Sequence, residues 1–182
     1  MYATIVTTAD ELLQIHLLNR ANYRQNISAE ERDKEGFVSW PYPMELLEKT
    51  QALAPHIILK DGEIVVGYAL VLLKEAAPFH KDLQGMFNNL ATLMYNGKPL
   101  ADYDYYVMGQ VCIDKPWRGK GAFNMLYQHH KKLYSNSFDM VITEISVSNI
   151  RSQRAHEKTG FKTIYGYTDA ADEWNVVAWD WK

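Results

Sequence analysis

The sequence predicts an α/β (α+β) fold with one mixed, mostly antiparallel central sheet, helices on both of its faces and a single parallel strand pair. Three observations support this prediction. Two β-branched runs joined by Asp61-Gly62 predict a hairpin over residues 56–73 with a type I′ turn. A strand over residues 103–113, a helix and a strand over 139–147 predict a right-handed crossover and therefore a parallel pair. A closing antiparallel strand over 174–181 makes the sheet mixed.

The length and composition favour one domain spanning residues 1–182. The chain is 47% hydrophobic and 23% charged, and no apolar run approaches the roughly 18 residues of a membrane span. The start of the chain lacks the pattern of a secretory signal, so we expect a cytoplasmic protein. The single cysteine, Cys112, agrees with a reducing compartment and is expected in the core. A net charge of -3 without a dense basic block argues against a nucleic acid partner.

The N-terminal third predicts one short strand and three helices. A β-branched start over residues 3–7 precedes Thr8 and Glu11, which form a capping-box pattern for a helix. Ser28 and Glu31 repeat that pattern, and Gly36 ends the second helix. A third helix begins at Pro43, placed at the first helical position. The first helix carries an apolar stripe of Ala9, Leu12, Leu13 and Leu17.

The remaining elements follow the hairpin in order. Residues 79–96 have apolar side chains along one helical face, and they precede the strand over 103–113. Within that strand Gly109 predicts a bulge. Helical patterns follow from Ala122 and over 149–159, separated by the strand over 139–147. A strand over 161–167, an acidic loop over 168–173 and the closing strand complete the chain.

The stretch WRGKGAFNMLY, residues 117–127, has the composition of an anion-binding loop. A helix N-terminus presents unpaired N–H groups, and glycines allow close approach of a bound anion. GxxxxGK[ST] is absent, and GxGxxG fails because Asn124 occupies the third glycine position. The stretch therefore supports neither a nucleoside triphosphatase nor a Rossmann dehydrogenase. The alternative is a tight turn in which glycine serves geometry alone.

A second polar motif occurs in the helix over residues 149–159. Asn149, Ser152 and His156 fall at i, i+3 and i+7 and therefore share one face. A polar stripe next to the strand ends indicates ligand contact. The alternative is a solvated surface helix capped by Asn149 and closed by Gly160.

Together these two segments resemble the GNAT superfamily of N-acetyltransferases. The phosphate loop of that family follows [QR]xxGx[GA], matched here by Arg118 and Gly121, with Phe123 where Gly or Ala is expected. The later family signature has Asn, then Ala or Ser, then usually Tyr, then Gly-Phe. It is matched by Asn149, Ser152, His156, Gly160 and Phe161. We expect the Phe123 side chain to point into the core while its amide faces the ligand.

The resemblance implies an N-acetyltransferase that transfers an acetyl group from acetyl-coenzyme A (acetyl-CoA) to a primary amine of a small molecule or a protein, by direct attack in a ternary complex. It also implies that the two parallel strands splay apart around the pantetheine arm. The strand backbone that hydrogen-bonds to the pantetheine arm would come from Val111, Cys112 and Ile113. The pyrophosphate would be surrounded by Arg118, Gly119, Lys120, Gly121 and Ala122, and Asn149 and Ser152 would line the same site.

The catalytic residues are less sharply specified by the sequence. His156 stands where many relatives have the tyrosine that protonates the leaving thiolate, so the resemblance makes it a candidate general acid. Candidates for the base are Asp104, Tyr105 and Tyr106 at one strand start and Glu144 on the parallel neighbour. Because strand side chains alternate, Tyr105 and Tyr106 point to opposite faces.

Other readings remain open at this stage. The His156-Glu157 pair does not begin an HExxH zinc motif, because residue 160 is glycine, so no metal is expected. By analogy with the family, Trp40, Tyr42 and residues 76–101 would border the acceptor pocket, and a core or surface role for the two aromatic residues is an equal alternative. The closing strand over 174–181 is a candidate homodimer contact. The main alternative function is a catalytically inactive CoA-binding module that senses or regulates, and a third is a domain that retains only the fold.

Overall fold

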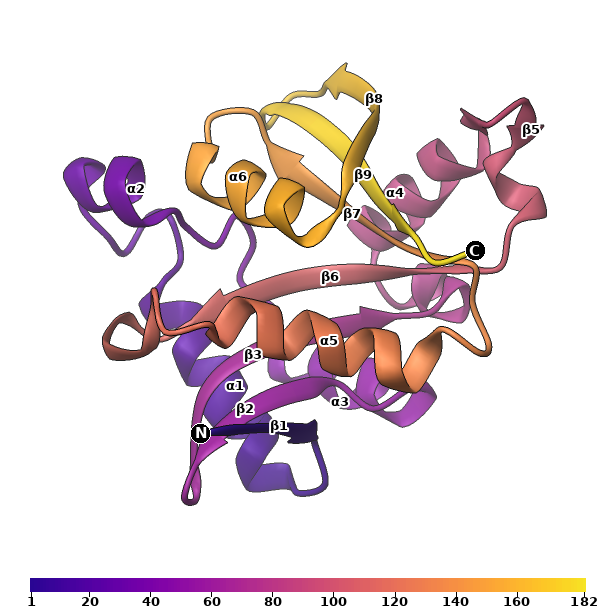
Figure 1. The fold of residues 1–182 in the computed structure, drawn as a ribbon. Helices are drawn as coiled ribbons and strands as arrows, with labels where there is room; N and C mark the ends of the chain where they lie inside the picture. Colours follow the sequence, from indigo (N-terminus) through magenta and orange to yellow (C-terminus); the bar gives the residue numbers. More distant parts are fainter.

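The computed structural model describes residues 1–182 and contains a seven-stranded sheet with helices on both faces (Figure 1). The strand order is β1-β2-β3-β6-β7-β9-β8, and only β6 and β7 are parallel. The mixed, mostly antiparallel fold is therefore confirmed. Its strands are β1 (Tyr2–Ile5), β2 (Ile57–Asp61), β3 (Ile64–Leu72), β6 (Tyr105–Ile113), β7 (Met140–Ser146), β8 (Lys162–Thr168) and β9 (Glu173–Asp180).

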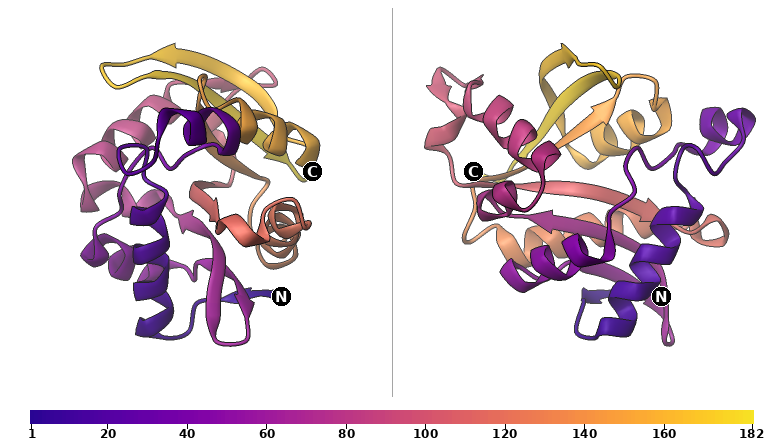
Figure 2. Two further views of the ribbon diagram at one scale, coloured as in Figure 1. Left: turned by 90° about the vertical axis from the view of Figure 1, so that its left-hand side faces the viewer. Right: turned by 180° about the vertical axis from the view of Figure 1, so that it is seen from behind.

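The helices divide between the two faces of the sheet, as Figure 2 shows from two further sides. One hydrophobic cluster joins α1, α3 and α4 to one face, and a second joins α5 to the other. Tyr105 belongs to the first cluster and Tyr106 to the second, which confirms their predicted alternation. The helices are α1 (Ala9–Ala21), α2 (Ala29–Glu35), α3 (Met44–Leu53), α4 (Lys81–Ala91), α5 (Ala122–Tyr134) and α6 (Ile150–Thr159).

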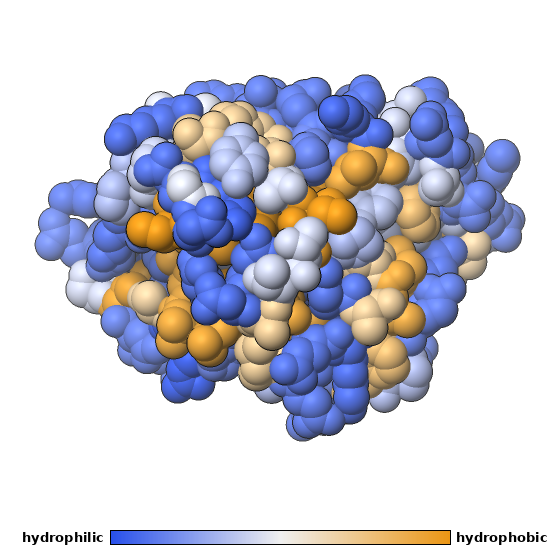
Figure 3. All heavy atoms as spheres, turned by 90° about the horizontal axis from the view of Figure 1, so that it is seen from below, coloured by the Kyte–Doolittle hydropathy of each residue, from blue (hydrophilic) through white to orange (hydrophobic).

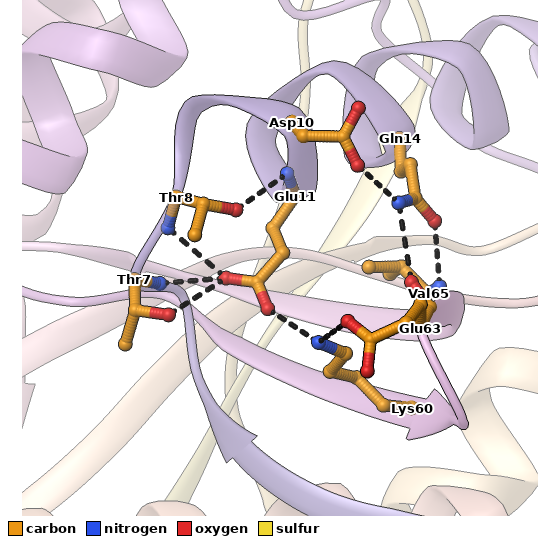
Figure 4. Close-up of polar contacts among 8 residues, drawn as sticks. All are labelled: Thr7, Thr8, Asp10, Glu11, Gln14, Lys60, Glu63 and Val65. Atoms are coloured by element: carbon orange, nitrogen blue, oxygen red, sulfur yellow. Dashed lines mark hydrogen bonds and ion pairs between the residues drawn. The ribbon is translucent and has the colours of Figure 1, made fainter.

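The start of α1 is built around a buried ion pair, drawn in Figure 4. The predicted capping box is present: the Glu11 amide donates to Thr8 Oγ1, and Glu11 Oε2 accepts from the Thr8 amide at 3.1 Å. Glu11 Oε1 also lies 2.8 Å from Lys60 Nζ on β2. Burial raises the pKa of Glu11, but the contacts with Lys60 and with the Thr7 and Thr8 amides lower it to about 2. The pair joins the first turn of α1 to the sheet.

The predicted apolar stripe of α1 was partly wrong. Leu13 and Leu17 are 46% and 58% exposed, whereas the buried face consists of Glu11, Leu12, Ile15 and Asn19. Polar residues occupy this face because each has a buried partner, as Glu11 has in Lys60.

The insert between β3 and β6 differs from the helix predicted over residues 79–96. A 3-10 helix (Lys74–Phe79) precedes α4, and α4 ends at Ala91. The short strands β4 (Met94–Tyr95) and β5 (Lys98–Pro99) then form a hairpin whose turn is Asn96-Gly97. Both turn residues have positive φ, 47° and 80°, as a type I′ turn requires. The turn chemistry of this pair outweighed the helical periodicity.

The β2–β3 hairpin is confirmed, but its turn is shifted by one residue. Asp61 pairs with Ile64, so Gly62 and Glu63 are the central residues. Gly62 has φ 59° while Glu63 does not have positive φ, which is the pattern of type II′ rather than type I′. Helix α3 likewise begins one residue later than predicted, because Pro43 is its N-cap and not its first helical residue.

The surface seen from below in Figure 3 is largely hydrophilic, with apolar groups between polar side chains. None of the helices combines the length and the apolarity that crossing a bilayer requires.

Candidate active site

The parallel strands separate soon after they begin. They pair only over Tyr105–Val107 and Met140–Ile142, and beyond this the two strands diverge (Figure 1). The ladder between β3 and β6 also shifts by one residue between Met108 and Val111, which places an extra residue on β6 and confirms the bulge predicted at Gly109. A Cβ atom on Gly109 would lie 2.6 Å from Tyr42 Oη and 2.8 Å from Leu72 Cγ, so a larger residue would displace these two buried side chains. The edge of β6 that faces β7 is therefore without a strand partner over its second half.

Two cavities lie along this opening. The first has a volume of about 760 Å³ and is lined by the glycine loop, α6 and the end of α2. The second has a volume of about 600 Å³ and is lined by α4, β7 and the loop between β8 and β9. Both volumes suit small-molecule ligands. The residues that line both cavities are Phe37, Val38, Val111, Asn149 and Ser152.

The glycine loop presents backbone to the first cavity. Gly119 and Gly121 have φ of 73° and 79°, and a Cβ at either position would contact nothing within 4 Å. Glycine is therefore required for the backbone conformation and not for space. Helix α5 begins immediately afterwards at Ala122, and Gly121 offers no side-chain cap. The first amides of α5 remain available to an anion in the cavity.

The Arg118 side chain is fixed by three contacts and does not project freely into the cavity. Its Nε donates to the Ile113 carbonyl at 2.9 Å and its Nη2 donates to Asn22 Oδ1 at 2.7 Å. Its Nη1 lies 3.2 Å from Glu35 Oε2 at the end of α2. The contacts with Asn22 and Glu35 connect the glycine loop to the segment around α2, which also lines the first cavity, and the contact with Ile113 ties the loop to the end of β6.

Asn149 makes a similar connection from α6. Its Oδ1 accepts from the Ser152 amide at 3.2 Å, which caps the helix as predicted, while its Nδ2 donates to the Phe37 carbonyl at 3.0 Å. Gly36 approaches so closely that a Cβ there would lie 2.9 Å from Asn149 Oδ1. The polar face of α6 therefore lines the cavities and is not a solvated surface.

His156 is fully buried, with both ring nitrogens occupied. Nδ1 lies 2.8 Å from the Ser152 carbonyl, which can only accept, so Nδ1 carries the hydrogen. Nε2 therefore accepts from Tyr127 Oη at 2.6 Å. Burial lowers the pKa of His156 to about 4, which keeps the ring neutral. The Phe123 ring packs edge-on against His156 and tilted against Tyr127, with centroid distances of 5.0 and 4.8 Å.

Glu144 lies on β7 and lines the second cavity. Tyr167 Oη on β8 donates to its Oε2 at 2.9 Å, and its Oε1 is buried without a partner in the protein. Burial raises the pKa of Glu144 to about 7, against the lowering effect of the Tyr167 hydrogen bond and together with the nearby Asp169 charge. A carboxylate with this pKa can accept a proton near neutral pH.

The family model that describes the acetyltransferase (GNAT) family matches residues 16–161. The chain belongs to the GNAT acetyltransferase family. Among curated proteins, none matches the sequence significantly.

GNAT structures share the fold over almost the entire chain at low sequence identity. The NatC complex bound to Gag peptide and CoA matches with 13% identity, a TM-score of 0.63 and coverage of 100% of both chains. The ribosomal-protein-S18-alanine N-acetyltransferase from Escherichia coli has 12% identity, a TM-score of 0.61 and coverage of 98% and 93%. A GNAT acetyltransferase from Streptococcus agalactiae has 17% identity, a TM-score of 0.64 and coverage of 99% and 96%.

The structure groups most of the predicted GNAT site residues around the first cavity, which is lined by Val111, Cys112, Ile113, Arg118, Gly119, Gly121, Ala122, Asn149 and Ser152. Burial raises the pKa of the Cys112 thiol to about 12, so it is an inert core residue, as expected. Lys120 lies outside the lining and places its Nζ 5.3 Å from the centre of the Trp117 ring.

Two of the candidate bases lie away from both cavities. Asp104 is exposed at the start of β6, where its amide donates to Asp139 Oδ2. Tyr105 is buried in the core, with Lys74 Nζ 4.2 Å from the centre of its ring. Both precede the point where the strands separate, so the GNAT opening does not reach them.

Several residues that complete this GNAT site were missed by sequence reasoning. Tyr127 and Tyr167 hold His156 and Glu144, and Glu35 and Asn22 hold Arg118. Strand alternation signals that Tyr165 and Tyr167 share a face, but no local pattern indicates that Tyr167 meets Glu144 on a strand 23 residues away.

Proposed function

We propose that this protein transfers an acetyl group from acetyl-CoA to a primary amine of a small molecule or a protein, by direct attack in a ternary complex. Membership of the GNAT family supports acyl transfer. The observation that carries the proposal is the opening between β6 and β7, along which the two cavities lie. The glycine loop lines the first cavity, and Glu144 lines the second.

Acetyl-CoA is the co-substrate that the first cavity suits. The pantetheine arm would pair with the free backbone edge of Val111, Cys112 and Ile113, because the amide groups of the extended arm need hydrogen-bond partners. The pyrophosphate would bind the amides at the start of α5. Arg118 would contribute positive charge to this site while keeping its contacts with Glu35 and Asn22. We also keep Gly119, Lys120, Gly121, Ala122, Asn149 and Ser152 in the proposed donor site.

Glu144 is the residue we assign as general base. Its Oε1 accepts a proton from the ammonium form of the acceptor, and the nitrogen lone pair then attacks the thioester carbonyl. A C–N bond forms and the C–S bond breaks. The second proton of the nitrogen passes to the leaving thiolate, which yields the acetamide and the thiol of coenzyme A, and Glu144 then releases its proton to solvent. Asp104 and Tyr105 are not part of this assignment, because neither lines the first or the second cavity.

His156 receives a positioning role in this proposal. Its Nδ1–H is engaged with the Ser152 carbonyl, and its Nε2 is engaged with Tyr127. A neutral imidazole held in this way joins α5 to α6 beside the leaving group and has no free proton to donate. The general-acid role expected from the family tyrosine therefore remains a prediction, and His156→Gln tests it. Loss of the basic limb in the kcat pH profile would support the general acid, whereas lowered stability with an unchanged basic limb would support positioning.

Acetyl-CoA binding and amine turnover test the proposal separately. Thermal unfolding with and without acetyl-CoA should show a rise of several degrees, because ligand at about a hundred times its Kd adds roughly 2.7 kcal/mol. Thiol release with a panel of primary amines then measures transfer. Glu144→Gln should keep the thermal shift and lose turnover. A thermal shift without turnover of any amine would favour the alternative, a CoA-binding module that senses or regulates.

The cytoplasmic location, the homodimer and the lack of a nucleic acid or membrane partner stay predictions from the sequence.

A further inference from the structure

Two residues that line the second cavity, from different elements, each carry a buried polar atom that has no partner in the protein. Glu144 Oε1 on β7 is an acceptor, and Asn89 Nδ2 on α4 is a donor. Buried polar atoms in folded proteins are nearly always paired, and a bound ligand is one way to pair them. A substrate that matched this cavity would therefore present a donor and an acceptor at the same time.

The fold brings these two atoms to the same face of the sheet. Glu144 is opposite Val176 in the antiparallel β7–β9 ladder, so both side chains lie on one face. Helix α4 packs on that face, because Leu83 and Phe87 share a hydrophobic cluster with Val176. Figure 2 shows α4 lying beside β7 and β9 in the view from behind.

Trp174 also lines this cavity and carries a third such buried atom, Nε1. Trp174 is opposite Ser146, two residues beyond Glu144, and therefore lies on the same face. Its indole N–H interacts with the Asp169 carboxylate without a well-aligned hydrogen bond. Asn89 is thus the freer of the two donors.

The charges around the cavity determine which kind of hydrogen-bond acceptor on the substrate suits Asn89. Asp82 and Asp169 line the cavity together with Glu144, and Lys81 is the one lysine among them. This excess of carboxylates attracts an ammonium group and repels a second carboxylate. An uncharged oxygen is therefore a better match for Asn89 than a carboxylate oxygen.

We propose that the acceptor is an amine with an uncharged carbonyl group on the neighbouring carbon, as in an amino acid amide or the first residue of a peptide. The amine would face Glu144 Oε1, and the carbonyl oxygen would accept from Asn89 Nδ2. Asn89 is then a specificity-determining residue, supplied by the insert between β3 and β6. This inference rests on the proposed function, because it assumes that Glu144 faces the attacking nitrogen.

Matched probes test the inference. Amides of glycine, alanine, methionine and phenylalanine are compared with the corresponding free acids and with the amines that lack the carboxyl carbon. Tripeptides that begin with the same residues distinguish a small-molecule source from a peptide source. For each probe kcat/KM is measured with the wild-type protein, with Asn89→Ala and with Asn88→Ala. Asn88 is exposed on the same helix and lines neither cavity, so it is the control.

The expected result is a loss of about tenfold in kcat/KM for amides or tripeptides with Asn89→Ala, the size of one hydrogen bond. The carbonyl-free amines and the Asn88→Ala variant should be unaffected, and free acids should be poorer substrates than amides. The inference would be overturned by equal losses for amides and carbonyl-free amines, by no loss for either, or by turnover confined to carbonyl-free amines. Absence of both acetyl-CoA binding and all amine turnover would instead reject the proposed function.

Discussion

Removing the Tyr167 hydroxyl is the sharpest test of the base. The hydroxyl donates to Glu144 at 2.9 Å and holds the carboxyl pKa down near 7 against burial. A hydrogen bond to a charged group contributes about 1.5–3 kcal/mol, and one pKa unit corresponds to about 1.4 kcal/mol. Tyr167→Phe should therefore raise the pKa of Glu144 by at least about one unit.

The assay is the pH dependence of kcat/KM for any amine that the protein acetylates. If the pKa moves from about 7 to about 8, the ionised fraction at pH 6 falls about ninefold, from about 9% to about 1%. At pH 9.5 both proteins are ionised, so their rates should converge. The titration of the substrate amine affects both proteins equally.

Tyr165→Phe is the matched control, because Tyr165 is on the same strand, is 45% exposed and lines neither cavity. It should retain the wild-type profile. A uniform loss at all pH values in Tyr167→Phe would show that Tyr167 acts only in packing. An unmoved limb would refute Glu144 as the titrating base.

Three further predictions concern stability. The pKa of Glu144 is about 7 in the folded protein against a usual 4.5. The contribution of Glu144 to the free energy of unfolding is therefore fully present below pH 4.5 and is lost as the pH rises through 7. Glu144→Gln should thus be more stable at pH 8 by on the order of 3 kcal/mol and unchanged at pH 4, measured by urea unfolding. Glu11→Ala should cost about 2 kcal/mol, because it removes the buried partner of Lys60 and the acceptor of the Thr7 and Thr8 amides and leaves Lys60 only the exposed Glu63. Glu63→Ala, at a side chain 96% exposed, should change stability by less than about 0.5 kcal/mol, and equal effects would contradict the argument from the buried pair. Gly109→Ala should lower the melting temperature through its clash with the Leu72 and Tyr42 side chains, while Gly85→Ala, where a Cβ meets nothing within 4 Å, should raise stability by about 1 kcal/mol.

Much of the first cavity could be predicted from the sequence because its determinants are local. Gly119 and Gly121 adopt backbone conformations that glycine favours, and both lie within one short loop. Asn149, Ser152 and His156 lie on one face of one helix, which depends only on helical spacing. The bulge at Gly109 was predictable for the same reason, since it concerns a single residue in a single strand.

Trp40, Tyr42 and part of the segment 76–101, which the resemblance placed at the acceptor pocket, do line the second cavity, but the pairing of its polar groups could not be predicted from the sequence. Glu144 was one of several base candidates of equal standing, and only the register of β7 and β8 against β9 brings it to Tyr167. Asp104 and Glu144 are both carboxylates on the parallel pair. The point where the strands separate leaves only Glu144 at a cavity.

By itself, the sequence determined the order of strands and helices, the GNAT signature and the conformations of the glycine loop, because these depend on periodicity and on the φ preferences of individual residues. The tertiary structure alone decided which carboxylate is buried enough to titrate near neutral pH, what occupies the nitrogens of His156 and where Asn89 lies. Desolvation and hydrogen bonding of a side chain depend on its neighbours in space. Those neighbours are set by strand register and helix docking across many residues of chain.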